Sequence, residues 1–188
     1  PQYTRRDYFY GKQWAFGVLH ALGGQSHLHG DLSGLIKKIK ALTQDPKADN
    51  CTYFYVNPEI QNHNLPYYEL CMRLGWNPEE VELDKFLEDY AILRYGERSA
   101  PNMLRCLKEL AGSVYSTGDD VTPLYQYPMG LWEETSPKRY PYILSLKNAL
   151  QFALLEKDNL RKNPLYHRDL IDISRQYIGE LFSYHLIK

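Results

Sequence analysis

The sequence lacks a strong charge of one sign, a long apolar run and a dense set of cysteines. Its 22 basic and 23 acidic residues leave a formal net charge of −1, whereas a nucleic-acid-binding domain normally carries a basic surplus. No apolar run approaches the roughly 18–20 residues that span a bilayer. We therefore expect neither a nucleic-acid partner nor a membrane-spanning segment.

The cysteines and the first residues each argue against one further feature. Cys51, Cys71 and Cys106 are too few and too scattered for a disulfide framework or a CxxC zinc site, although one pair among them stays open. The first residues contain neither an initiator methionine nor the apolar region of a signal peptide. We expect the chain to begin inside a longer gene product.

Tyrosine, by contrast, is abundant, with 17 tyrosines among aromatic residues that make up 14% of the chain. A tyrosine ring stacks on flat polar ligands such as sugars while its hydroxyl group forms hydrogen bonds. Tyrosine can also do the work of phenylalanine in a helical core. Composition alone leaves both interpretations open.

The first 65 residues contain two apolar runs of β character, at 14–20 and 52–56. Both runs are continuous, which is typical of strands buried on both faces of a parallel sheet. The segment between them has apolar residues at helical spacing, and Asp31 or Ser33 is the candidate N-cap. Strand, helix and strand in this order predict a βαβ unit with parallel strands.

From Leu65 onward the periodicity is helical and we find no convincing strand. Gly96 is expected to end the second of the helices, and a loop carrying Tyr125, Tyr127 and Trp132 is expected at 116–136. The helices are predicted at 65–74, 83–95, 101–115, 138–157 and 164–186.

One βαβ unit does not make a stable sheet, and a closed parallel barrel needs eight strands. The predicted fold class is therefore α/β followed by all-α, and helical overall by content. Residues 1–65 are expected to form the last βα units of a TIM (β/α)8 barrel, and residues 66–188 an all-α domain.

The loop after the first predicted strand, His20–Gly30, is a candidate substrate-binding loop. Gly23 and Gly24 permit positive φ and a close approach of the backbone to a ligand. The loop also contains three histidines, but His27 and His29 do not lie on one helix face and the loop offers too few ligands for zinc. We expect no metal and no cofactor, and a polar loop that faces substrate.

A second candidate, Glu59, follows the end of the second predicted strand. In a barrel this position lies at the mouth where substrates bind, although a glutamate after a strand is also commonly a solvated loop residue. Retaining glycosidases use two carboxylates about 5 Å apart. The sequence offers one plausible member of such a pair.

These segments together resemble the α-N-acetylglucosaminidase family of glycoside hydrolases, in the same order from about residue 9 to residue 186. The matching stretches are Tyr10-Gly-Lys-Gln-Trp14, Leu19-His-Ala-Leu-Gly-Gly24 with Gly30, Asn57-Pro-Glu-Ile60 with Asn64, Tyr68-Glu-Leu70, Leu83-Asp84, Tyr90, Arg94-Tyr-Gly96, Ser113-Val-Tyr115, Thr122-Pro-Leu124 and Asn163-Pro-Leu-Tyr-His-Arg-Asp-Leu-Ile-Asp-Ile-Ser-Arg-Gln176.

The resemblance implies a TIM barrel followed by an all-α domain, and a retaining enzyme that removes terminal α-linked N-acetylglucosamine from glycans. It places the nucleophile at Glu59 and the acid/base glutamate on an earlier strand outside this chain. The remaining part of the barrel is then a partner of this segment, which alone is expected to be inactive. The family's compartments are lysosomal, secreted or periplasmic.

The resemblance also suggests which residues line the sugar site. They are His20, Gly23, Gly24, Gln25, Phe16, Asn57 and Asn64. The family commonly has Trp where Phe16 stands and Asn where Gln25 stands, so the specificity for the N-acetyl group is expected to differ.

Two other classes remain open from the residues themselves. One is a non-catalytic helical module that binds carbohydrate or protein, and the other is a zinc-dependent hydrolase.

Overall fold

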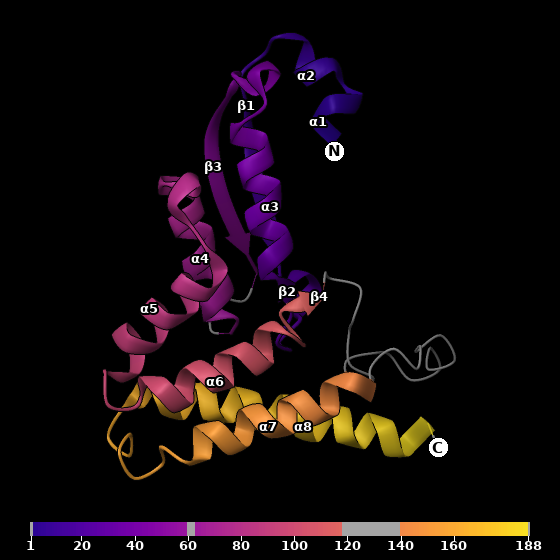
Figure 1. Cartoon of the computed structure of the whole chain (residues 1–188). Helices are drawn as coiled ribbons and strands as arrows, with labels where there is room; N and C mark the ends of the chain where they lie inside the picture. Colours follow the sequence, from indigo (N-terminus) through magenta and orange to yellow (C-terminus); the bar gives the residue numbers. More distant parts are fainter. Residues whose placement is uncertain (1, 60–62, 118–139, 188) are drawn as a thin grey trace.

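The computed structural model describes residues 2–59, 63–117 and 140–187, in which an upright unit of strands and helices stands on a layer of helices (Figure 1). The short N-terminal turns α1 (Gln2–Arg5) and α2 (Asp7–Tyr10) precede β1 (Trp14–His20). The elements that follow are η1 (Leu22–Gly24), β2 (Gly30–Asp31), α3 (Leu32–Thr43), η2 (Pro46–Ala48), β3 (Cys51–Pro58), α4 (Leu65–Trp76), η3 (Pro78–Glu80), α5 (Leu83–Tyr95), α6 (Ala100–Ala111), β4 (Ser116–Thr117), α7 (Tyr140–Leu154) and α8 (Pro164–Ile187).

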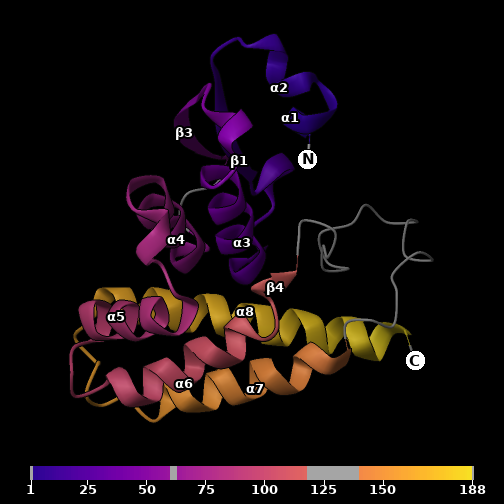
Figure 2. The same ribbon diagram turned by 45° about the horizontal axis from the view of Figure 1, so that its top comes forward.

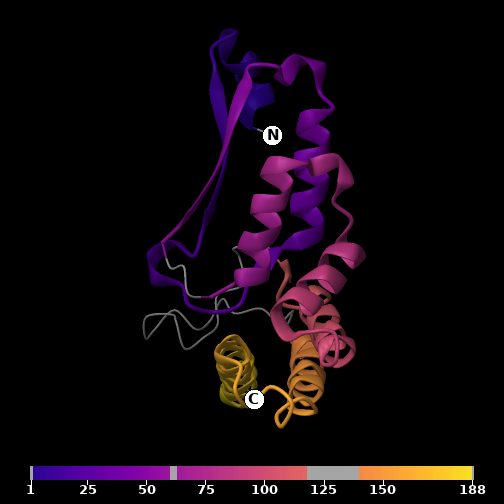
Figure 3. The same ribbon diagram turned by 90° about the vertical axis from the view of Figure 1, so that its left-hand side faces the viewer.

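β1 and β3 pair in parallel, as the βαβ pattern predicted. The register places Phe16 beside Phe54, Val18 beside Val56, and the last residue His20 beside Pro58. Both strands therefore end at the same edge of the sheet. Figure 3 shows α3 and α4 together on one side of the two strands.

The expectation that these strands are buried on both faces was wrong for the described residues. The face with Phe16, Val18 and His20 packs toward the helices, whereas Leu19 and Tyr53 on the other face are 49% and 69% exposed. Side chains alternate between the two faces of a strand, and no described element covers this second face. We refer to it as the open face of the sheet.

α3 forms where the apolar spacing predicted a helix. Its buried stripe is Leu32, Leu35, Ile36, Ile39 and Leu42. Of the two candidate caps, Asp31 is the one used, since its Oδ1 accepts a hydrogen bond of 2.7 Å from the backbone N–H of Gly34. This bond satisfies one of the free amides of the first turn.

The helical layer consists of α5, α6, α7 and α8, which lie across the base of the upright unit (Figure 2). α5 has the predicted bounds, and Gly96 follows it with a φ of +81°. α6 ends at Ala111, four residues before the predicted end, and its last turn is closed by the backbone N–H of Gly112. Of the loop expected at 116–136, all but Ser116 and Thr117 lies outside the described residues, together with Tyr125, Tyr127 and Trp132.

One short strand pair was missed. β2 and β4 pair in antiparallel fashion, Gly30 with Thr117 and Asp31 with Ser116, so the expectation of no strand after Leu65 was wrong. A two-residue strand is too short to show a periodic pattern. The pair ties the start of α3 to the end of α6.

A single buried apolar cluster runs from the strands through α4 into the helical layer. α4 packs on α3 and β3 as well as leading into α5. Cys51, Cys71 and Cys106 are all free, so no pair among them forms. Among the described helices none is both long enough and apolar enough to cross a membrane.

Candidate active site

Glu59 lies directly after β3, beside the loop that follows β1. Its backbone N–H donates a hydrogen bond of 3.2 Å to the carbonyl oxygen of His20. Its side-chain Oε2 accepts a hydrogen bond of 2.6 Å from the backbone N–H of Gly23. The parallel pairing therefore brings the carboxylate and the glycine loop together at one edge of the sheet. Glu59 is exposed to solvent in the described part of the chain.

The glycines hold the loop in a conformation that other residues rarely adopt. Gly23 and Gly24 have φ of +66° and +79°, in the left-handed region. A side chain at either position would meet no atom within 4 Å. Glycine is therefore required there by the backbone conformation, and the space above the loop is open.

His20 lies beneath this loop and is only 1% exposed. Its ring stacks between His29, at 4.0 Å between ring centroids, and Tyr67, at 4.5 Å. Its Nε2 is 3.3 Å from the carbonyl oxygen of His29, and its Nδ1 is 2.8 Å from the hydroxyl group of Tyr68. A carbonyl oxygen only accepts, so Nε2 carries the proton and Nδ1 accepts from Tyr68.

Burial fixes the charge of this group. Desolvation and the neighbouring His29 lower the pKa of His20 to about 3, because burial disfavours the charged form. Desolvation likewise raises the pKa of Tyr68 to about 12. Near neutral pH His20 is uncharged and Tyr68 remains protonated, so the hydrogen bond between them is neutral.

The second half of the loop, Ser26–His29, is held by side chains from other elements. Asn64, at the start of α4, accepts from the backbone N–H of His29 at 2.9 Å and donates to the carbonyl oxygen of His27 at 3.1 Å. Gln176 of α8 accepts from the backbone N–H of Leu28 at 2.9 Å. Buried backbone groups outside regular structure need such partners.

Arg175 and Asp172 of α8 contact both the glycine loop and the segment that leads into α4. The guanidinium group of Arg175 donates to the carbonyl oxygen of Ser26, and its Nη2 is 3.3 Å from Oδ1 of Asp172. Asp172 in turn accepts from Nδ1 of His63 at 2.9 Å. Asp172 is buried and His63 is half-buried.

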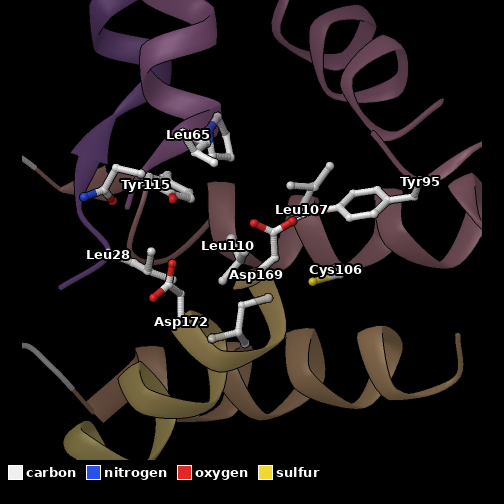
Figure 4. A pocket seen from close by; sticks show the side chains of 12 residues that line it. Leu28, Leu65, Tyr95, Cys106, Leu107, Leu110, Tyr115, Asp169 and Asp172 are labelled. Atoms are coloured by element: carbon white, nitrogen blue, oxygen red, sulfur yellow. Dashed lines mark hydrogen bonds between the residues drawn. The ribbon is translucent and has the colours of Figure 1, made fainter. Parts of the chain in front are cut away.

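A cavity lies where the loop, α4, α6 and α8 meet (Figure 4). Leu28 enters it from the loop, and Asp169 and Asp172 enter it from α8. Its volume of about 30 Å³ is room for about one water molecule, whereas ligand pockets usually exceed roughly 300 Å³. It is therefore a packing space behind the loop and not a sugar site.

Asp169 forms a second polar contact at this junction. Nε and Nη2 of Arg94 donate to its two carboxylate oxygens at 2.6 and 2.8 Å, and the hydroxyl group of Tyr95 donates at 2.7 Å. Both charged side chains are largely buried, with 11% and 15% exposure. The hydrogen-bonded carboxylate raises the pKa of Arg94 despite its burial, so the guanidinium group stays charged.

The structure brings some of the expected site residues together and separates others. Glu59, Gly23 and Gly24 meet at the sheet edge, with Gln25 next along the loop and His20 and Asn64 buried beneath it. Phe16 lies in mid-strand on the helix-facing side, stacked on Phe54 at 6.0 Å. Asn57 lies on the open face, beside Leu19.

Sequence reasoning missed the residues of α8 that support the loop. The sequence did contain a pattern that could have indicated them, since four polar residues recur at helical spacing along α8. These residues are Asp172, Gln176, Glu180 and Ser183, and the structure shows that all four are buried. A polar stripe on the inner face of a helix indicates specific partners. Within the described residues no group of three His, Cys, Asp or Glu side chains is placed to hold a metal ion.

Known proteins resemble this chain in sequence and in fold. Residues 1–78 match the family model described as the α-N-acetylglucosaminidase TIM-barrel domain. The human α-N-acetylglucosaminidase is 27% identical over 195 residues, covering 97% of this chain and 25% of the human protein.

Solved structures share the fold. A family 89 glycoside hydrolase from Clostridium perfringens, in complex with 2-acetamido-1,2-dideoxynojirmycin, has a TM-score of 0.75 and 18% identity. It is covered over 21% of its length and covers 94% of this chain. A form of the same enzyme with two glutamates changed to glutamine, in complex with its substrate GlcNAc-α-1,4-galactose, gives the same TM-score and identity, covering 94% of this chain and 20% of that one.

The matching family model describes the TIM-barrel domain of a glycosidase, and the solved structures share the fold of this chain. The family model and the human relative are both α-N-acetylglucosaminidases, which is the family that the sequence resembles. The chain spans about a quarter of the length of the human relative and about a fifth of the bacterial one.

Proposed function

We propose that this chain is the C-terminal part of a retaining exo-glycosidase that removes terminal α-linked N-acetylglucosamine from glycans, with Glu59 as the nucleophile. The observation that carries the proposal is the hydrogen bond of 2.6 Å between Gly23 N–H and Oε2 of Glu59. It joins a carboxylate to a glycine loop at the carboxyl edge of parallel strands, where barrel enzymes bind their substrates.

The chemistry follows from a carboxylate held in this way. The Gly23 N–H holds Oε2 of Glu59 in place, and Oε1 attacks the anomeric carbon while the glycosidic bond breaks. A second carboxylic acid protonates the departing oxygen, and the same group then activates the water that releases the sugar. We place that acid/base group outside this chain, on an earlier barrel strand.

The proposal divides the chain into a barrel part and a helical domain. We had drawn the junction at residue 65, and the contacts of α4 with α3 and β3 favour one nearer residue 78. The open face of the sheet, with Ala15, Leu19, Tyr53 and Asn57, would then face the inside of the barrel. In this arrangement the rest of the barrel covers the apolar side chains and adds the acid/base group.

The proposed sugar site is lined by Gly23, Gly24 and Gln25 above Glu59. His20 and Asn64 act from beneath, by fixing the loop. The activity assigned to the human and bacterial relatives makes α-linked N-acetylglucosamine the proposed substrate.

The test is Glu59→Gln in the full natural polypeptide that contains residues 1–188, with Glu97→Gln as the matched control at an exposed position after α5. On an aryl α-N-acetylglucosaminide, E59Q is expected to lower kcat by about 1,000-fold or more, because the nucleophile is lost while its shape is kept. E97Q is expected to change kcat less than about twofold.

A second variant separates a nucleophile from a residue that only shapes the site. Glu59→Ala with added azide is expected to release the aryl group and form a glycosyl azide of inverted configuration, because azide takes the place of the missing carboxylate. If E59Q keeps its activity, or if the full polypeptide hydrolyses none of these substrates, the proposal is wrong.

A further inference from the structure

The glycine loop and the segment that follows β3 are connected by two sets of contacts, and the second set involves α8. One junction is the hydrogen bond between Gly23 and Glu59 at the sheet edge. The other runs from Ser26 through Arg175 and Asp172 to His63. Ser26 is three residues beyond Gly23, and His63 is four residues beyond Glu59.

The geometry points to a positioning role. We propose that Arg175 and Asp172, with Gln176, are positioning residues that fix the glycine loop and Glu59 relative to each other, so that the helical domain sets the geometry of the sugar site. This inference rests on the proposed function and deepens it, since it assigns a task to a part of the chain that carries no chemistry of its own.

Two links of this second junction are hydrogen bonds that involve a charged group, and the third is the ion pair between Arg175 and Asp172. Arg175 presents one guanidinium nitrogen both to the Ser26 carbonyl oxygen and to Oδ1 of Asp172. Asp172 is 7% exposed, and its partner His63 donates at 2.9 Å. Hydrogen bonds to charged groups are shorter and stronger than neutral ones, so the chain of contacts resists stretching.

Gln176 adds an independent anchor. Its Oε1 accepts from the backbone N–H of Leu28, and its Nε2 donates to Oε1 of Glu180 at 3.0 Å. The donation to Glu180 orients the amide so that its oxygen faces the loop. Gln176 is 2% exposed, so water does not compete readily for these bonds.

The short tethers explain why this support reaches the site. A chain spans at most roughly 3.3–3.6 Å per residue, so an anchor at Ser26 keeps Gly23 within roughly 10–11 Å of it and reduces the number of conformations open to the loop. Misplacing reacting groups by about 1 Å costs on the order of 100-fold in rate. A loss of Arg175 should therefore act on the chemical step more than on binding.

The experiment compares Arg175→Met with Arg168→Met in the full natural polypeptide. Arg168 lies two turns earlier on α8 and is exposed, so R168M removes the same charge and chain length without touching either loop. We measure kcat and KM on an aryl α-N-acetylglucosaminide well below the midpoint of thermal unfolding, and amide hydrogen exchange over residues 22–29.

R175M is expected to lower kcat by roughly 10- to 100-fold, to change KM by less than about threefold, and to raise exchange in the loop. R168M should leave all three at the unmodified values. A helix that merely holds the domains together would instead lower the unfolding midpoint without this split between kcat and KM.

Arg175→Lys covers the case in which R175M does not fold. It keeps a cation beside Asp172 but loses the planar guanidinium group, and an intermediate loss of kcat is expected. If the unmodified polypeptide is active and the folded Arg175 variants match R168M, the positioning role is wrong and the proposed function stands. If the unmodified polypeptide has no activity on this substrate, the proposed function and the role built on it both fall.

Discussion

The upright strand unit and the helical layer bury their apolar residues in different ways. In the helical layer, α6, α7 and α8 enclose residues such as Leu146 and Ala149 that have no exposed surface. In the strand unit one face of the sheet packs on α3 and α4, while Tyr53 and Leu19 on the open face are exposed. The comparison shows that the helical layer has fully buried residues between its helices, whereas the described part of the sheet is packed on one face alone.

The polar contacts follow the same division. Deep in the helical layer, Arg94 and Asp169 are paired through two hydrogen bonds. Lys40 of the strand unit instead contacts Glu82, the residue before α5, at the surface, with Glu82 74% exposed. Since solvent screens exposed pairs strongly, the stability of the two regions should respond differently to the loss of a charge.

The largest expected effect concerns the sheet. Residues 1–188 produced alone should show no turnover of an aryl α-N-acetylglucosaminide and should aggregate or be only partly ordered, because a two-stranded sheet with an open face is marginal in water. Size-exclusion chromatography with light scattering and an activity assay test this. A monodisperse monomer that melts cooperatively and turns over substrate would contradict this prediction. It would also show that the sheet needs no further cover than the helical layer does.

The next effect is in the helical layer. Arg94→Met, measured by urea unfolding of the full natural polypeptide, should lower the free energy of unfolding by about 3 kcal/mol, because Asp169 remains buried with a charge and loses its cation. Lys40→Met is the matched change in the strand unit and should cost less than about 1 kcal/mol. Equal losses for the two variants would contradict the contrast between a buried and an exposed pair.

The smallest effect concerns pH. The pKa of His20 is lowered to about 3 in the folded chain and is about 6.5 when unfolded, so the unfolded state binds the extra proton between these values. Stability is thus fully present above pH 6.5 and is lost as the pH falls toward 3, by about 2 kcal/mol between pH 7.5 and 5. The groups facing His20 are His29, Tyr67 and Tyr68, with His27 stacked behind His29.

Urea unfolding at these two pH values tests this on the full natural polypeptide. His20→Gln should remove most of the loss, because a glutamine takes up no proton. His185→Gln, at an exposed position near the end of α8, should keep it. If H20Q retains the unmodified dependence on pH, another group is responsible.

Much of the architecture could be predicted because it depends on the spacing of apolar residues along short segments of the chain. The stripe from Leu32 to Leu42 and the bounds of α5 follow from apolar spacing, and the parallel pairing follows from the order of strand, helix and strand. The resemblance in family motifs predicted the family that the comparisons found, whereas the barrel arrangement and the role of Glu59 stay predictions.

What could not be predicted depends on contacts between distant residues. The burial of His20 between His29 and Tyr67, and the use of Gln176 to bind Leu28 N–H, arise only when the strands and α8 meet. The family positions of Phe16 and Asn57 gave no indication that one would face the helices and the other the open face. Strands as short as β2 and β4 are too short to show a periodic pattern in the sequence.

The bond between Leu28 and Gln176 also has a consequence for how the protein is made. The two residues are 148 positions apart, and a ribosome adds roughly 5–20 residues per second. The glycine loop therefore waits roughly 7–30 s after its own synthesis before its support on α8 exists. During that interval the strands and Asn64 are already made, but the loop lacks its contacts with α8, so the site is among the last parts of the chain to take its final shape.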